Sequence, residues 1–405
     1  MSNVFHLAAK IRAVPPYLAT EDEAIEVAKA IAERIATRSN HRGHDRILPY
    51  DKMALVAQSG LLGVTVSSEY GGTDISNASL AELIAILSEA DSSVGQIPQS
   101  HFYILEALRL AGSDAQKQYF FARALAGEYF ADVLTEAEPT ASEDIAIRLI
   151  PDGVGYRISG RGYCSPGALF ADWMAIFCLD PQNRIVMAIV PRQTEGLAIV
   201  DEGHVLSPRA AARGGVVIDN IYVSQDAVID HYRNFERHVP LGALGQLLLA
   251  AVDLGIARSS FAEMIRLLRT GERGSGRPET GATSGDQLTI ARTGSIAIKI
   301  EAACALLERA GRKVDVAQID QSQETAIEAS IAVAAAKALT ADAALEANRS
   351  LDELADPSPS KGEPGLDCHW SDARMHTLHD PVRWKHYAIG DFHLNGKVPR
   401  PNGQF

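Results

Sequence analysis

Apolar residues return every three or four positions along the first third of the chain. This period starts at Thr20, and Glu23 completes a capping-box signature with it. The same period covers 50–59 and 76–91, and a second capping-box signature lies at 113–116. These segments predict that the chain begins with an all-α domain.

The period changes to two near residue 131. Apolar residues alternate from Ile145 to Leu149, and they alternate again after the turn signal Asp152-Gly153. No helical stretch long enough for a parallel crossover separates the later β-rich runs, which are 172–179, 184–191 and 214–223. The pattern therefore predicts an antiparallel sheet in the middle of the chain.

The helical period returns after Pro240 and continues almost to the end. Gly and Pro residues divide it into four blocks, 240–271, 286–311, 322–355 and 369–390. The expected fold is α+β and multidomain, with an N-terminal helical domain over 1–130, a middle antiparallel β domain over 131–236 and a C-terminal four-helix bundle over 237–405.

Composition and charge narrow the possible partners. The net charge of −13 opposes binding to nucleic acid, which depends on neutralising phosphates. The longest apolar stretch, Leu241 to Leu254, is interrupted by Gln246 and Asp253 and is shorter than the ~20 residues of a membrane span. The first ten residues lack the basic start and apolar run of a secretory signal. We expect a cytoplasmic protein with no membrane partner, and its four scattered cysteines are expected to be reduced thiols.

Three short segments concentrate the polar chemistry, and none contains a Gly-rich phosphate loop or a GxSxG elbow. His376 and His379 are spaced to share a helix face just before Pro381. Alternatively, these histidines are solvent-exposed or lie in the core without a catalytic role. A zinc site is a third reading, but no further zinc ligands stand in a recognisable motif. The segment 91–102 alternatively reads as a helix kink, and 163–173 as a surface turn.

Together these segments resemble a known family. The chain is similar to the sulfur-acquisition oxidoreductases of the dibenzothiophene monooxygenase type, within the acyl-CoA dehydrogenase superfamily. The resemblance spans nearly the whole chain, and its superfamily part includes Glu69-Tyr70-Gly71-Gly72. Its most specific part is His376-Thr377-Leu378-His379-Asp380-Pro381, followed by Leu394-Asn395-Gly396.

This resemblance implies a two-component flavin monooxygenase. Such an enzyme uses reduced FMN, supplied by a separate NAD(P)H:flavin reductase, and O₂ to oxidise a small organosulfur compound such as a sulfone. The matching catalytic residues are His379, His376 and Ser165. Many acyl-CoA dehydrogenases carry a proton-abstracting Glu in the last helix, where this chain has Leu378-His379-Asp380, so dehydrogenase chemistry is disfavoured.

The resemblance also implies the residues that bind cofactor and substrate. The cofactor residues it implies are Leu134, Thr135, Ser165, Arg209, Arg277, Trp370 and Arg374. Gln96 and His101 match the substrate pocket, no metal is expected, and FAD is the alternative flavin. The superfamily implies a homodimer or homotetramer.

Departures from the family pattern support a second hypothesis from a different class. Residues expected to bind flavin are replaced at Gly203, Ala210, Ala211, Cys368 and Ser371. An arginine paired with a phosphate is a strong bidentate contact, so its loss weakens FMN binding. The second hypothesis is a flavin-weak or flavin-free homologue that acts as a binding or assembly subunit.

Overall fold

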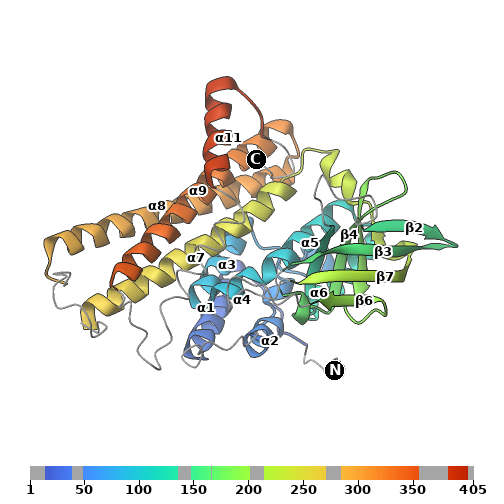
Figure 1. Cartoon of the computed structure of the whole chain (residues 1–405), viewed down its shortest axis with the longest axis horizontal. Helices are drawn as coiled ribbons and strands as arrows, with labels where there is room; N and C mark the ends of the chain where they lie inside the picture. The colour runs from blue at the N-terminus through green and yellow to red at the C-terminus, as the bar shows by residue number, and fades with distance from the viewer. Residues whose placement is uncertain are drawn as a thin grey trace.

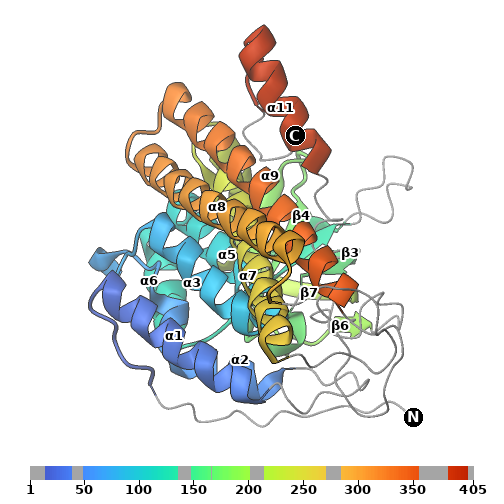
Figure 2. The same cartoon turned by 90° about the vertical axis from the view of Figure 1, so that its left-hand side faces the viewer.

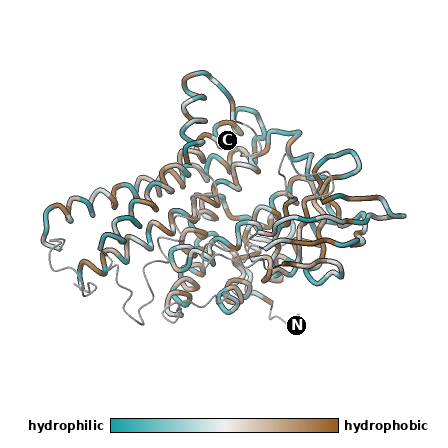
Figure 3. Tube along the Cα trace, viewed as in Figure 1, coloured by the Kyte–Doolittle hydropathy of each residue, from teal (hydrophilic) through white to brown (hydrophobic). Residues whose placement is uncertain are grey.

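The computed structural model describes residues 14–38, 49–135, 147–165, 167–200, 214–270, 284–354 and 382–399. The β-sheet lies at one end of the molecule and the long C-terminal helices at the other, with the N-terminal helices between and beneath them (Figure 1). In Figure 3 the long helices carry alternating apolar and polar stretches, as expected for helices with one buried face.

The N-terminal part is helical, as the sequence predicted. Its α-helices are α1 (Glu21–Arg38), α2 (Tyr50–Gln58), α3 (Asn77–Ala90), α4 (Ser92–Gln96), α5 (Pro98–Ala111) and α6 (Asp114–Leu125). The capping box at Ser113 and Gln116 is confirmed, since each side chain bonds the backbone of the other residue. At α1, Glu23 N–H donates to Thr20 Oγ1, but the Glu23 carboxylate accepts from Ala19 rather than Thr20.

The middle part forms a single sheet. Its strands are β1 (Phe130–Thr135), β2 (Arg148–Asp152), β3 (Gly155–Cys164), β4 (Trp173–Leu179), β5 (Ile185–Pro191), β6 (Leu197–Val200), β7 (Gly215–Ser224) and β8 (Val228–Ile229). The main path is β6-β7-β3-β1-β4-β5-β8, and β2 pairs with β3 and β4. Most pairings are antiparallel as expected, but β1 pairs parallel with β4, as does β2 at one residue pair. The sheet is therefore mixed, because β4 returns beside β1 after the β2–β3 hairpin.

Long helices make up the C-terminal part. They are α7 (Leu241–Thr270), α8 (Gln287–Ile319), α9 (Gln323–Leu354) and α11 (Val382–Asn395). The helices α7, α8 and α9 lie side by side, whereas α11 stands at an angle to them and projects from the molecule (Figures 1 and 2). The start of the fourth expected block, 369–381, lies outside the described residues. Division of the chain at 131 and 237 into separate domains stays a prediction.

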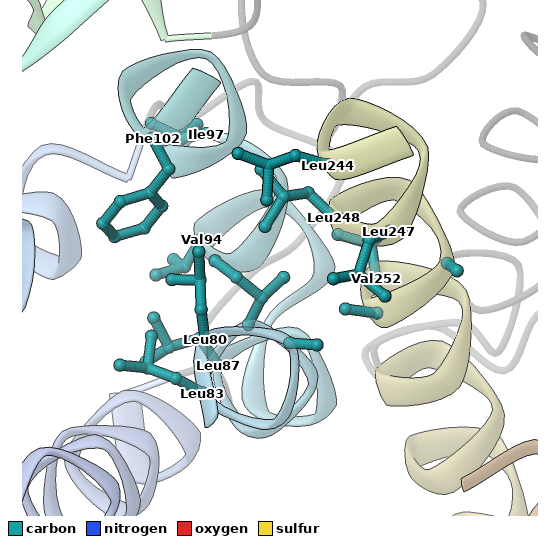
Figure 4. Packing of buried hydrophobic residues seen from close by; sticks show 14 of the residues in the cluster. Leu80, Leu83, Leu87, Val94, Ile97, Phe102, Leu244, Leu247, Leu248 and Val252 are labelled. Atoms are coloured by element: carbon teal, nitrogen blue, oxygen red, sulfur yellow. The ribbon is translucent and has the colours of Figure 1, made fainter. Parts of the chain in front are cut away.

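Helix α3 is the centre of the helical core. Its buried leucines Leu80, Leu83 and Leu87 belong to the same hydrophobic cluster as apolar side chains of α4, α5 and α7, including Leu244 and Leu247 (Figure 4). Such a core is stabilised by removing apolar surface from water and by close packing. The N-terminal helices and the bundle therefore share one hydrophobic core.

Two glycines let neighbouring helices approach α3 more closely than a larger residue permits. A Cβ at Gly255 of α7 would lie 2.4 Å from Ala85 O and 2.4 Å from Ser88 Cβ. A Cβ at Gly311 of α8 would lie 2.5 Å from Ala78 Cα. All three distances are shorter than any ordinary contact between non-bonded atoms. The spacing of α7 and α8 from α3 thus depends on the absence of side chains at these positions.

A buried ion pair joins α7 to α9. Lys337 Nζ lies 2.5 Å from Asp253 Oδ2, and both side chains are 0% exposed. Removing one partner from such a pair leaves an uncompensated charge in the interior and costs about 3–5 kcal/mol. The pair therefore opposes sliding of α9 along α7.

Helix α7 is long and apolar enough to cross a membrane by length and composition. However, 78% of its most apolar window is buried inside the protein. This burial is that of a core helix, which agrees with the interruption of its apolar stretch by Gln246 and Asp253. The described cysteines Cys164, Cys178 and Cys304 are free thiols, as expected.

We predict opposite effects for two Gly→Ala substitutions within helices. Gly255→Ala should lower the melting temperature, because overpacking against α3 costs typically about 1–3 kcal/mol. Gly390→Ala is the matched control in α11, since a Cβ there meets nothing within 4 Å. Alanine is favoured over glycine in a helix by roughly 0.5–1 kcal/mol, so the control should be neutral or stabilised. Thermal unfolding followed by circular dichroism measures both, and equal melting temperatures would contradict the packing argument.

Candidate functional site

Polar side chains from α4 and α5 form a stripe that faces α7 and the sheet. Gln99 and Ser100 each lie three or four residues from both Gln96 and Tyr103, so the four side chains share one side of these consecutive helices. Gln99 Nε2 donates to Leu248 O of α7 at 3.3 Å, and Ser100 Oγ lies 3.1 Å from Ser165 Oγ beyond β3. The Tyr103 ring lies against Gly245 of α7. All three parts of the fold therefore meet at this stripe.

The ends of β1 and β3 supply the second wall of the site. Leu134 and Tyr163 pair across these antiparallel strands, and their side chains are 51% and 50% exposed. Ser165 follows β3 and exchanges two hydrogen bonds with Asp132: its N–H donates to Asp132 O at 3.0 Å, and its Oγ accepts from Asp132 N–H at 3.1 Å. The structure therefore brings Leu134 and Thr135 of β1 close to Ser165, where β1 pairs with the last residues of β3.

His101, expected in the substrate pocket, is buried instead. Its side chain is 0% exposed, with Nε2 2.8 Å from Leu62 O, and Nδ1 accepts from Phe130 N–H at 3.2 Å. A ring that accepts at Nδ1 and donates at Nε2 is neutral, and burial lowers the pKa of His101 to about 4. With both nitrogens bonded to backbone, the ring does not fit the expected substrate contact. It joins α5 to the turn at Leu62 and to the start of β1.

The placement of Gln96 in a substrate pocket stays a prediction. Gln96 is half-buried at the end of α4, on the same side as Ser100. The other expected site residues, His376, His379, Arg209, Arg277, Trp370 and Arg374, lie outside the described residues. The same holds for the departures at Gly203, Ala210, Ala211, Cys368 and Ser371.

Sequence reasoning missed several polar residues at this junction, namely Ser100, Tyr103, Tyr129 and Gln246. Gln246 Oε1 is buried in α7 and has no hydrogen-bond partner in the described structure. Two signals were present in the sequence: the polar spacing that leads from Gln96 to Ser100, and the interruption of an apolar helix by Gln246. No local pattern pointed to Tyr129, which precedes β1.

Burial keeps the tyrosine hydroxyls and the cysteine thiol of this region protonated. It raises the pKa of Tyr103, with a smaller contribution from the charge of Asp132. It also raises the pKa values of Tyr129 and the Cys164 thiol. These groups are therefore neutral donors and acceptors near neutral pH. No group of three His, Cys, Asp or Glu side chains suited to a metal ion occurs in the described part of the chain.

Family models match both helical ends of the chain. The acyl-CoA dehydrogenase N-terminal domain matches residues 20–128, and the acyl-CoA dehydrogenase C-terminal domain matches residues 247–384. The chain belongs to the acyl-CoA dehydrogenase family.

Several relatives that match nearly the whole chain are monooxygenases. A dibenzothiophene monooxygenase from Mycolicibacterium goodii is 27% identical over 398 residues, which cover 93% of this chain and 95% of the relative. A probable FMNH₂-dependent monooxygenase from Pseudomonas putida is 22% identical and covers 94% of this chain and 96% of the relative. The crystal structure of TdsC from Paenibacillus sp. A11-2 with FMN and indole superposes with a TM-score of 0.84 at 25% identity, covering 94% of this chain and 99% of that chain.

We predict that His101 makes stability depend on pH. Its pKa is about 4 in the folded protein and 6.5 ordinarily, so the unfolded chain binds the proton more readily. This difference corresponds to about 3 kcal/mol at neutral pH. It is lost as the pH falls from about 6.5 to about 4. His101→Asn, which keeps an amide for hydrogen bonding, should be less stable at pH 7 and should show a shallower loss of stability across that window.

Urea unfolding at a series of pH values measures this effect. His231 remains in both proteins, and burial lowers its pKa to about 4 as well, so part of the pH dependence should persist in the variant. His238→Asn changes an exposed histidine and serves as the control. Identical pH dependence in His101→Asn and the wild type would show that the ring is not held neutral.

Proposed function

We propose that this protein is a two-component flavin-dependent monooxygenase that uses reduced FMN and O₂ to oxidise a small organosulfur substrate of the sulfone type. The observation that carries the proposal is the nearly full-length match to a dibenzothiophene monooxygenase and to a probable FMNH₂-dependent monooxygenase. These matches cover all three parts of the fold. The polar residues of the candidate site lie where these three parts meet.

The described residues fit the ring system of a flavin. Leu134 and Tyr163 offer a half-exposed apolar surface on which a planar heterocycle can lie. Ser165 offers a polar atom beside that surface, because its Oγ keeps a lone pair for a ligand after accepting from Asp132 N–H. We propose that Arg209, Arg277, Trp370 and Arg374 complete the cofactor site, as the family resemblance implies.

Bound reduced FMN supplies the electrons that activate O₂ for oxygen transfer. The residues of this chain orient the flavin ring through Ser165, shield it with the apolar core behind β1, and place the substrate beside Gln96. We propose that His379 and His376 hold or move a proton at the reacting oxygen atoms, since imidazole donates or accepts near neutral pH.

We predict that His379→Ala lowers product formation by about 10²-fold, the usual contribution of a positioned acid or base. The assay supplies FMN, NADH and a flavin reductase, and it follows a sulfone substrate by chromatography. Oxidation of the reduced flavin should continue, with hydrogen peroxide released in place of oxygenated product. Full coupling of flavin oxidation to product in the variant would make His379 structural.

Two alternatives remain open to test in the same preparation. A dehydrogenase should reduce an electron-accepting dye with acyl-CoA, which we do not expect because His379 stands where such enzymes carry Glu. A flavin-free assembly subunit should bind neither FMN nor FAD when titrated by fluorescence. Binding of FMN in preference to FAD, together with oxygenated product, supports the proposed monooxygenase.

We propose further that the protein is cytoplasmic, receives reduced FMN from an NAD(P)H:flavin reductase, and forms a homodimer or homotetramer. Helix α8 supports the assembly, because Ile290 and Ile298 are 54% and 72% exposed on one side of it. Ile298→Glu should reduce the oligomer mass measured by light scattering. Val154→Glu, at an exposed turn of the sheet, is the control. An unchanged mass in the α8 variant would place the interface elsewhere.

A further inference from the structure

A chain of hydroxyl groups runs from the interior to Ser165. It begins at Tyr129, whose Oη lies 2.6 Å from Ile97 O at the junction of α4 and α5. A carbonyl oxygen only accepts, so the single hydroxyl hydrogen of Tyr129 is donated to it. Burial raises the pKa of Tyr129, which keeps that hydrogen on the ring oxygen. The inner end of the chain therefore has a fixed direction.

This direction passes from one hydroxyl to the next. Ser100 Oγ lies 3.2 Å from Tyr129 Oη, and because the tyrosine hydrogen is engaged, Ser100 must donate to Tyr129. Ser165 Oγ lies 3.1 Å from Ser100 Oγ and donates to it for the same reason. Asp132 N–H then donates to Ser165 Oγ. Each hydroxyl hydrogen thus points inward, and what Ser165 has left to offer a ligand is a lone pair.

The backbone around the chain holds these distances. Gly167, two residues after Ser165, has φ +89, where L side chains are strained, and a Cβ there would lie 3.1 Å from Tyr129 Oη and 2.6 Å from Ile97 Cγ2. The Tyr129 ring also stacks on the buried His101 ring, with centroids 5.7 Å apart. The tyrosine is thus confined between α5 and the turn after β3.

We propose that Tyr129 and Ser100 are positioning residues that fix Ser165 as a hydrogen-bond acceptor toward the bound flavin, so that the site favours the reduced over the oxidised cofactor. The inference rests on the proposed function. Reduced flavin carries a ring N–H at N5 that oxidised flavin lacks. An acceptor beside the ring stabilises the reduced form, whereas a freely rotating serine hydroxyl serves both forms.

The test is the ratio of the dissociation constants for oxidised and reduced FMN, measured by anaerobic fluorescence titration. Tyr129→Phe removes the anchoring hydroxyl and keeps the ring, so Ser100 and Ser165 become free to reverse their donors. We expect the ratio to fall about tenfold, the equivalent of one hydrogen bond. Ser100→Ala should lower it similarly. Tyr222→Phe, at an exposed tyrosine of β7, should leave it unchanged.

A double-mutant cycle separates positioning from a general structural effect. In a Ser165→Ala background, Tyr129→Phe should change the ratio no further, because the acceptor that it positions is already absent. Circular dichroism verifies that each variant is folded, and Ser100→Ala provides a second route if Tyr129→Phe is unstable. An unchanged ratio in both variants, or effects that add in the Ser165→Ala background, would overturn the inference alone. Failure of the wild-type protein to bind either form of FMN would overturn the proposed function and this inference with it.

Discussion

The position of the candidate site depends on one neutral imidazole ring inside the molecule. His101 bonds Leu62 through one nitrogen and Phe130 through the other, so it ties α5 both to the N-terminal helical core and to the first residue of β1. Strand β1 continues from Phe130 to Leu134, and Ser165 bonds Asp132 of the same strand. The His101 ring therefore helps to position both Leu134 and Ser165. A protonated ring would have no acceptor for Phe130 N–H, so the same contact also excludes the charged form.

The periods of the sequence predicted the order of helices and strands, because burial on one face of an element leaves a regular apolar pattern. These periods gave wrong predictions where a residue type can serve more than one structural role. The second C-terminal block was expected to end at Gly311, yet α8 continues to Ile319 because this glycine contacts α3 rather than ending the helix. Parallel pairing of β1 with β4 also escaped the pattern, since alternation shows which residues face the core and not which strand lies alongside.

The candidate site was only partly accessible to sequence reasoning. Family resemblance pointed to Ser165 and Gln96, both of which lie at the junction of the three parts of the fold. It also pointed to His101, whose neighbourhood in sequence is polar but whose neighbourhood in space is backbone and apolar rings. The partners of Ser165 come from α5 and from the residue before β1, far along the chain. Hydrogen bonds across such separations leave no local pattern, so they require the folded structure.

The ion pair between Lys337 and Asp253 has an evolutionary consequence. The two residues are separated by 84 positions in sequence, yet both are fully buried and each supplies the counter-charge of the other. Replacing Asp253 alone leaves the charge of Lys337 in the bundle interior, whereas replacing both by apolar residues of similar volume leaves no such buried charge. Substitution at these sites is therefore expected to be correlated among related chains, so that two distant positions vary as a single unit.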